Sequence, residues 1–312
     1  MATRLSGGKL RTHMRGSAGS GLAAAGRSLR DFLRLSLSTT SGRIGLSIVL
    51  LHFTLAVIGP WLAPYPPTEF HYDETGVLQQ HTAPCWQFWL GTDQFGRDVL
   101  SRVMSGATSL IMVSGAGTAL GIALGTIVGM SSAYKGGWVD EVVMRVADGI
   151  MSFPALLLTL LVLTSLGPSQ VNIAAIIGVL SMPRVARVVR SRVVSLKTRE
   201  FVESARLRGE GASYIIFREI LPNALPVLGV EASIRLSYAI LAVSALGFLG
   251  MGVQPPSSDW GLMIAQSREF LNIAPWVALA PAVAVASLVV GINLLSDGIR
   301  QASGLPRREE RP

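Results

Sequence analysis

Three long stretches of this chain contain no charged residue, which limits it to folds that a lipid bilayer can accommodate. Asp, Glu, Lys and Arg are absent from the 30 residues of Met104–Ala133, the 35 of Gly149–Pro183 and the 23 of Ile273–Leu295. A hydrocarbon core about 30 Å thick needs roughly 20 apolar residues in a helix, so each stretch is long enough to span it. Charged residues make up only 15% of the chain, against about 25% in an average soluble domain. We therefore predict an all-α polytopic membrane protein.

The apolar segments divide into six predicted transmembrane helices. Gly167-Pro168-Ser169 interrupts the longest uncharged stretch and indicates two helices joined by a tight outer turn. The predicted spans are approximately 44–63, 104–133, 142–166, 170–188, 225–251 and 275–295. Residues 43–300 form the predicted transmembrane domain, with an outer loop at 65–102 and a polar loop at 190–222. We expect residues 1–42 to be a retained, flexible basic tail, since the first apolar run begins too late for a secretory signal, and residues 301–312 to be a second tail.

Basic residues predict the orientation, because cytosolic loops are enriched in Lys and Arg. Eight Lys or Arg precede Ile44, and the segment Pro183–Pro222 holds nine against four Glu. The segment Tyr65–Arg102 instead holds two Arg against five acidic residues. Both termini and the 190–222 loop are therefore predicted to be cytosolic. This placement of the basic residues beside the spans accounts for the net charge of +8 without a nucleic-acid partner.

Four glycines recur at every fourth position of the second predicted span: Gly117, Gly121, Gly125 and Gly129. This spacing places hydrogen atoms instead of side chains along one helix face, so that a neighbouring helix can approach closely. The neighbour is predicted to be a helix of the same chain or of a second membrane subunit.

Four ionisable residues lie near the inner ends of predicted spans: Arg145, Asp148, Glu231 and Arg235. Charged groups at membrane depth are costly and often mark a transport path. Glu231 and Arg235 are four residues apart on one helix face and can also pair with each other. A transport role and structural ion pairing are both consistent with the sequence.

Signals of enzymatic or metal chemistry are weak. His71, His81 and Cys85 share the outer loop, but their spacing matches no recurrent metal-ligand pattern, so no metal site is predicted. The single cysteine excludes an intrachain disulfide and a CxxC site. The sequence contains no GxxxxGK[ST] phosphate-binding loop, no HExxH and no GxSxG motif. We predict a protein that is not an enzyme and binds no cofactor directly.

The polar loop combines an apolar helix face with two helix-breaking glycines. Phe201, Ala205 and Gly209 are spaced by four, and Gly209 and Gly211 are expected to end that helix. A second short helix is predicted over Tyr214–Leu221, before Pro222. The result is a compact, bent, two-helix knob.

This knob has two possible binding partners. A cleft in a partner protein can accept a pair of short helices. Alternatively, Arg206, Arg208 and Arg218 can hold an amphipathic helix against anionic lipid. The physical pattern does not distinguish the two.

The motifs in three segments resemble those of a known family. Glu203-Ser204-Ala205, Gly209 and Leu221-Pro222 resemble the EAA loop of ABC importer permeases, with Ser204 replacing the usual alanine and Glu210 as an extra charge. Residues 90–102 (LGTDQFGRDVLSR) and 246–256 (LGFLGMGVQPP), with Trp260-Gly261, resemble two outer segments of the dipeptide/oligopeptide/nickel branch. The single span before a long outer loop is similar to its C-type subunit.

The resemblance implies one of two permeases in a peptide importer, with a B-type permease, two ATPase subunits that bind ATP and Mg²⁺, and an extracytoplasmic solute-binding protein as partners. An importer of nickel or another small solute is the alternative within the family, and a self-contained channel or secondary transporter is the alternative outside it. The implied ATPase-docking residues are Glu203, Ser204, Ala205, Arg206, Gly209, Ile220, Leu221 and Pro222. The implied binding-protein dock contains Gly91, Asp93, Gly96, Arg97, Asp98, Pro255, Pro256 and Trp260. The implied location is the bacterial inner membrane.

Overall fold

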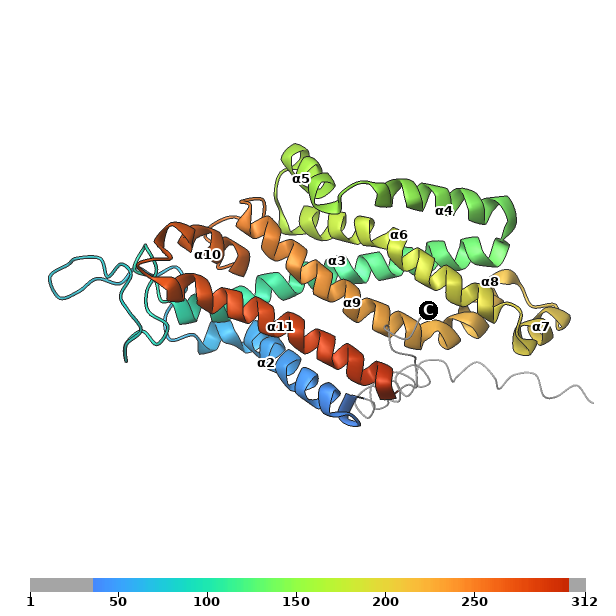
Figure 1. The fold of residues 1–312 in the computed structure, drawn as a ribbon, viewed down its shortest axis with the longest axis horizontal. Helices are drawn as coiled ribbons and strands as arrows, with labels where there is room; N and C mark the ends of the chain where they lie inside the picture. The colour runs from blue at the N-terminus through green and yellow to red at the C-terminus, as the bar shows by residue number, and fades with distance from the viewer. Residues whose placement is uncertain (1–35, 303–312) are drawn as a thin grey trace, which may run out of the picture.

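The computed structural model describes residues 36–302, and the regular elements in that range are helices (Figure 1). The long helices are α2 (Thr40–Leu62), α3 (Val99–Lys135), α6 (Gln170–Leu196), α9 (Leu221–Phe248) and α11 (Pro275–Ala302). The shorter ones are α4 (Gly137–Ser152), α5 (Ala155–Leu166), α7 (Glu200–Leu207), α8 (Ala212–Tyr214), a π-helical turn (Ile215–Ile220), α10 (Trp260–Ser267) and a 3-10 turn (Arg268–Phe270). Most of the predicted N-terminal tail and nearly all of the C-terminal tail lie outside the described residues.

Side-chain caps explain where three of the long helices begin. Thr39 accepts a hydrogen bond from the backbone N–H of Gly42, before α2. Asp98 does the same for Ser101 at the start of α3, and Ser169 for Asn172 at the start of α6. Each cap satisfies a backbone donor that has no partner inside the helix.

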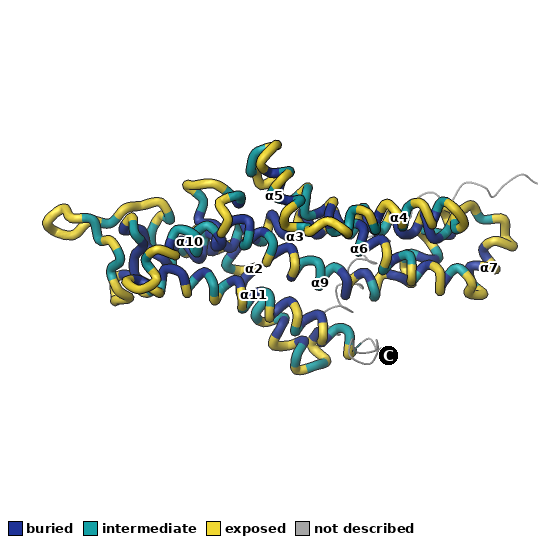
Figure 2. The backbone as a smooth tube through the Cα atoms, turned by 45° about the horizontal axis from the view of Figure 1, so that its top comes forward, coloured by how far each residue is buried: buried dark blue, intermediate teal, exposed yellow. Residues whose placement is uncertain are grey.

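Within residues 36–302, five helices are long and apolar enough to cross a membrane, and a sixth crossing results if α4 and α5 together form one. The sequence predicted one continuous helix over 142–166, and this prediction is wrong because the structure has two helices there, α4 and α5. The chain bends by 82° between α4 and α5, at Phe153-Pro154. A proline disfavours the α conformation of the residue before it, which explains the break. Figure 2 shows that α5 projects from the bundle, with much of its surface exposed.

The glycines of α3 allow its close approach to α6, as Figure 1 illustrates. A Cβ atom on Gly117 would lie 3.0 Å from the carbonyl oxygen of Ala174, and one on Gly125 would lie 2.5 Å from Cβ of Val185. Gly121 and Gly129 likewise face α6. The neighbouring helix is therefore one from the same chain.

Two buried clusters divide the bundle along its length. We call the end that carries α7 the inner end and the end that carries α10 the outer end, after the predicted orientation. The outer cluster joins α2, α3, α9, α10 and α11 around Trp260, which is fully buried and donates a 2.8 Å hydrogen bond to the carbonyl oxygen of Val103. The inner cluster joins the ends of α3 and α6 to α7, the π-helical turn and α9.

Candidate functional site

The inner-end knob, defined as Glu200–Pro222, is built on α7. Val202 and Ala205 are fully buried in the inner cluster, which also contains residues from the ends of α3 and α6 and from the π-helical turn. The opposite face of α7 is exposed, and Leu207 is 85% exposed at its end. An amphipathic helix is thus fixed to the bundle by one face and leaves the other face exposed.

Gly209 ends α7 in the way that the sequence predicts. Its φ is +78°, a conformation that glycine adopts without a steric penalty. The N–H of Gly209 donates to the carbonyl oxygen of Arg206 at 2.9 Å, and the N–H of Glu210 to that of Ala205 at 3.2 Å. This pair of hydrogen bonds is the Schellman arrangement, which satisfies the last carbonyl groups of a helix.

The second half of the knob differs from the prediction. Instead of a separate short helix over Tyr214–Leu221, residues 212–248 form one continuous helical rod that contains the π-helical turn. Pro222 lacks an N–H group and its ring crowds the carbonyl group four residues earlier. The preceding π-helical turn, where the N–H of Leu221 donates to the carbonyl oxygen of Ile216, shifts the hydrogen-bond register and lets the helix continue.

Polar contacts attach the knob to its surroundings. Arg208 lies 3.3 Å from Glu219 and so connects the end of α7 to the π-helical turn. The Arg206 guanidinium lies 5.6 Å from the ring centroid of Tyr134, at the end of α3. Lys197 donates to the carbonyl oxygen of Ala133 at 3.0 Å.

The predicted docking residues fall into two groups by exposure. Ala205 and Ile220 are fully buried, so they support the knob and are not part of its surface. The exposed members are Glu203, Ser204, Arg206, Gly209 and Pro222, and Leu221 is half-buried. Sequence reasoning missed Leu207, although its position two residues before Gly209 at the end of an amphipathic helix was a usable signal.

At the outer end, Asp93 organises the segment before α3. Its carboxylate accepts backbone hydrogen bonds from Phe95 at 2.8 Å and Arg97 at 3.0 Å. It also pairs with the side chain of Arg97 at 2.8 Å and that of Arg102 at 2.5 Å. Gly96, with φ of +67°, closes the turn. One fully buried carboxylate therefore fixes two guanidinium groups beneath the loop.

Much of the predicted binding-protein dock is consequently buried. Asp93 and Trp260 are 0% exposed, Asp98 is 1% exposed and Arg97 is 8% exposed. Gly91 and Gly96 are buried, whereas Pro255 and Pro256 are exposed. The buried members are supports of the outer surface.

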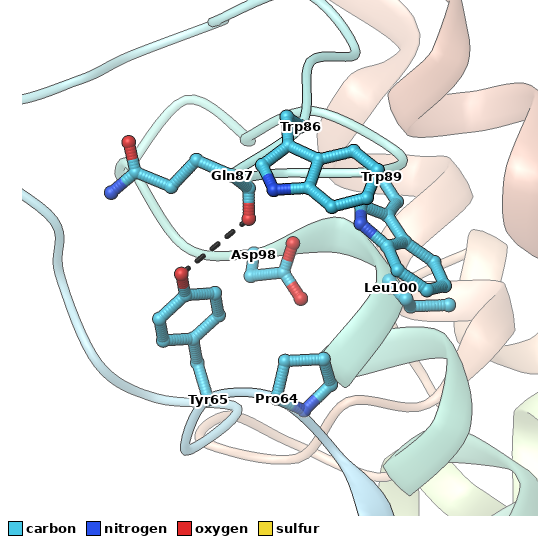
Figure 3. Close-up of a pocket in the computed structure, with 7 residues that line it drawn as sticks. All are labelled: Pro64, Tyr65, Trp86, Gln87, Trp89, Asp98 and Leu100. Atoms are coloured by element: carbon cyan, nitrogen blue, oxygen red, sulfur yellow. Dashed lines mark hydrogen bonds between the residues drawn. The ribbon is translucent and has the colours of Figure 1, made fainter.

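The outer loop carries an aromatic pocket that sequence reasoning missed. Its volume is about 410 Å³, and Figure 3 shows its lining residues: Pro64, Tyr65, Trp86, Gln87, Trp89, Asp98 and Leu100. Trp86 is 90% exposed and Trp89 is 65% exposed. The hydroxyl of Tyr65 donates to the carbonyl oxygen of Gln87 at 3.4 Å, across the pocket. The pair of tryptophans three residues apart in a polar loop was the available signal.

Asp259 caps α10 from a buried position. It is 0% exposed, its Oδ1 accepts from the N–H of Leu262 at 3.2 Å, and its Oδ2 has no hydrogen-bond partner. Burial raises the pKa of the Asp259 carboxyl from 3.8 to about 6. The backbone hydrogen bonds of the cap oppose this shift only partly.

The ionisable groups near the inner ends of the spans form ion pairs. Asp140 accepts two 2.8 Å hydrogen bonds from Nε of Arg190 and one of 2.6 Å from its Nη2. Asp148 pairs with Arg187, and both pairs line a groove of about 570 Å³ between α4 and α6. Arg145 pairs only loosely with Glu141, at 3.9 Å.

Glu231 and Arg235 form the predicted pair on α9, at 2.7 Å. In the outer loop, His71 packs against the rings of Tyr65 and Phe88, and His81 against Phe270. Within residues 36–302 no group of three or more His, Cys, Asp or Glu is arranged to hold a metal ion.

Comparison with known proteins identifies the family to which this chain belongs. Residues 121–304, which include the inner-end knob, match the family described as binding-protein-dependent transport system inner membrane component. The chain belongs to this family. It is an ABC importer permease, a multi-pass inner-membrane protein and a transport component, not an enzyme. Membership implies a partner permease, an ATPase and a binding protein, and a permease subunit carries no cofactor of its own.

Individual relatives cover nearly the whole permease. The chain is 36% identical over 259 residues to the dipeptide transport system permease protein DppC of Alkalihalophilus pseudofirmus, covering 83% of this chain and 84% of that protein. It is 35% identical over 280 residues to the di/tripeptide transport system permease protein DppC of Pseudomonas aeruginosa, covering 88% and 91%. It is 36% identical over 274 residues to the glutathione transport system permease protein GsiD of Escherichia coli, covering 88% of each.

Proposed function

We propose that this chain is the C-type permease of an ATP-driven importer of di- or oligopeptides and forms half of the translocation pathway. The observation that carries the proposal is its similarity to dipeptide, di/tripeptide and glutathione permeases over more than four-fifths of the chain. The other half of the pathway comes from a B-type permease. Two ATPase subunits bind the ATP and Mg²⁺, and an extracytoplasmic binding protein delivers the peptide.

The inner-end knob is the ATPase dock in this proposal. Its exposed surface comprises Glu203, Ser204, Arg206, Leu207 and Pro222. Leu207 supplies an apolar anchor for a groove in the partner, as helix-in-groove recognition requires. The buried face of α7 makes the knob part of the bundle, so a force on the knob is passed to α3, α6 and α9. Closure of the ATPases would then drive alternating access.

The outer surface near Pro255 and Pro256 is the binding-protein dock in this proposal. The aromatic pocket with Trp86 and Trp89 offers a second, concave and apolar contact on the outer loop. Tryptophan is enriched where protein interfaces concentrate their binding energy. The Asp93 turn holds the loop in position from beneath.

The distribution of basic residues supports cytosolic termini and a cytosolic knob. The segment 190–222 then faces the nucleotide-binding subunits, and the loop 65–102 faces the binding protein.

A co-purification experiment tests the ATPase dock. The complex is expressed with all its partners, and ATPase recovery is compared between the wild type, Gly209→Trp and Gly137→Trp. No atom lies within 4 Å of the site where a Cβ atom would stand on either glycine, and both have positive φ, at +78° and +59°. The two variants therefore carry similar backbone strain, and they differ in whether the indole faces the docked ATPase.

We expect Gly209→Trp to lose the ATPase and Gly137→Trp to retain it. Full ATPase recovery and full ATP-dependent uptake in Gly209→Trp would refute the docking assignment. The substrate class is tested separately, by import of radiolabelled dialanine and trialanine into proteoliposomes that contain the complete complex and its binding protein. Absence of import for both peptides, with import of another solute, would refute it.

A further inference from the structure

A tight turn of the outer loop leaves two tryptophans on its surface. Between them, Phe88 is 1% exposed and packs with its ring centroid 5.6 Å from that of Tyr65. The N–H of Cys85 donates to the carbonyl oxygen of Phe88 at 2.9 Å, which closes the turn. Trp86 and Trp89 stay exposed on either side, with ring centroids 6.5 Å apart. Exposed apolar side chains gathered in this way mark an interaction surface.

Asp98 supplies a carboxylate to the aromatic pocket between these rings. Figure 3 shows this carboxylate among the side chains of Tyr65, Trp86 and Trp89. Its Oδ2 accepts from the N–H of Ser101 at 2.8 Å and from the hydroxyl at 2.6 Å, and so satisfies the start of α3. Its Oδ1 accepts no hydrogen bond from the residues 36–302 that the structure describes, although Asp98 is only 1% exposed. One oxygen of a buried carboxylate therefore remains for a ligand.

The aromatic pocket combines two features that bind an organic cation. The faces of tryptophan and tyrosine rings attract ammonium and guanidinium groups. A carboxylate forms short, charge-assisted hydrogen bonds with the same groups, and it repels an anion. The volume of about 410 Å³ lies near the lower end of the range for ligand pockets, roughly 300–1,000 Å³. The pocket therefore suits one cationic group of modest size.

The exposed charges of the outer loop are acidic as well. Glu69, Asp73 and Glu74 are exposed, and none of them forms an ion pair within the described part of the chain. The two arginines of the loop are turned inward, onto Asp93. Figure 2 shows the loop extending beyond the helices at the outer end, with much of its surface exposed. A surface of one sign steers a partner of the opposite sign, so the partner is basic where it meets this loop.

The exposure of the tryptophans indicates what kind of partner carries the cation. Small-molecule pockets bury about 70–90% of their ligand, whereas Trp86 is 90% exposed and leaves this wall of the pocket open. A protein that brings its own cation also supplies the missing wall. We propose that the aromatic pocket binds an arginine or lysine side chain on the docking face of the extracytoplasmic binding protein, a step that rests on the proposed function above. Tryptophan and arginine are both enriched where interfaces concentrate their binding energy.

The first test measures the affinity of the cognate binding protein for the complete importer in nanodiscs, by biolayer interferometry. The wild type is compared with Trp86→Ala and with Trp61→Ala. Trp61 is the matched control, because it is 82% exposed at the outer end of α2 and does not line the pocket. We expect Trp86→Ala to weaken binding at least about tenfold and Trp61→Ala to leave it unchanged. The wild-type affinity should fall as the ionic strength is raised.

The second test identifies what lies against the aromatic pocket. A photoreactive benzoylphenylalanine replaces Trp86, the working complex is illuminated, and the crosslinked site is located by mass spectrometry. The expected site is on the binding protein, beside an arginine or lysine. Replacing that basic residue by Gln should weaken binding to the wild type and add no further loss in Trp86→Ala, since the two side chains form one contact.

Three results would contradict the inference, and one of them also contradicts the proposed function. Crosslinking only to lipid or to the partner permease, with unchanged affinity in Trp86→Ala, overturns the inference while the importer still binds its binding protein. A crosslink to the binding protein with no basic residue coupled to Trp86 overturns the assignment of a cation. If no binding protein binds the wild-type complex and no peptide is imported, the proposed function fails and the inference fails with it.

Discussion

The packing of α3 on α6 makes a quantitative prediction for Gly125→Ala. The new Cβ atom would lie 2.5 Å from Cβ of Val185, 2.6 Å from its Cγ1 and 2.8 Å from the carbonyl oxygen of Met182. Carbon atoms in contact prefer about 3.5–4.0 Å. Two of the obstacles are close to the backbone of α6, so no flexible side chain can move aside, and the helices must separate by roughly 1 Å.

The expected cost follows from a matched variant on the same helix. Gly115 has no atom within 4 Å of its would-be Cβ, so Gly115→Ala changes helix propensity without a clash. Both substitutions gain up to about 1 kcal/mol of helix propensity, while only Gly125→Ala pays about 1–3 kcal/mol for overpacking. The difference between the two variants is therefore about 1–3 kcal/mol. At about 2–4 °C per kcal/mol for a domain of this size, their midpoints should differ by roughly 2–12 °C.

The measurement is thermal unfolding of the purified complex in one detergent, followed by tryptophan fluorescence at a fixed heating rate. Gly125→Ala should unfold at a lower temperature than Gly115→Ala, and Gly125→Leu lower still. Equal midpoints for the two alanine variants would show that the contact between α3 and α6 is not as close as the structure has it.

Three further predictions concern the outer end. Asp93→Asn leaves Arg97 and Arg102 buried without a carboxylate, at a cost of about 3–5 kcal/mol; limited proteolysis from the outer side should cleave the loop 65–102 in this variant and not in the wild type. Trp260→Ala should cost about 3–5 kcal/mol, seen as a lower unfolding midpoint, because a fully buried indole and its hydrogen bond are lost. The pKa of Asp259 is raised from 3.8 to about 6 by burial, so the folded state holds this proton more tightly than the unfolded state. Its contribution to stability is therefore fully present below pH about 4 and is lost as the pH rises through about 6. In the wild type, hydrogen exchange of α10 should therefore rise between about pH 5 and 7, after correction for the intrinsic rate. Asp259→Asn should abolish this rise, and an unchanged rise would contradict the assignment.

Local sequence patterns predict those features of this fold that depend on local chemistry. The four-residue glycine spacing in α3 requires only one helix and one neighbour, and α6 occupies that place. The end of α7 at Gly209 depends on one residue that adopts positive φ readily. The pairing of Glu231 with Arg235 depends on helical spacing alone.

Tertiary contacts decide the features that the sequence does not predict. Whether Phe153-Pro154 curves a span or bends it by 82° depends on what packs around α4 and α5. The motif around Asp93 indicates a structured segment, but whether its side chains face outward or inward depends on Arg102, nine residues later, and on α10. Polar residues in a loop are usually on the surface, so a dock was the natural interpretation of residues that the structure buries.

The continuity of the rod 212–248 connects the knob mechanically to the rest of α9. A helix that joined the knob to α9 through a flexible hinge would absorb a displacement at its inner end. Here the π-helical turn keeps the backbone hydrogen-bonded through Pro222, so no break separates the knob from the rest of α9. Arg208 and Glu219 hold α7 against this rod. If an ATPase moves the knob, Glu231 and Arg235 must move with it relative to α11, and the hydrogen bond between Ser237 and Asn293 is where that movement would first be detected.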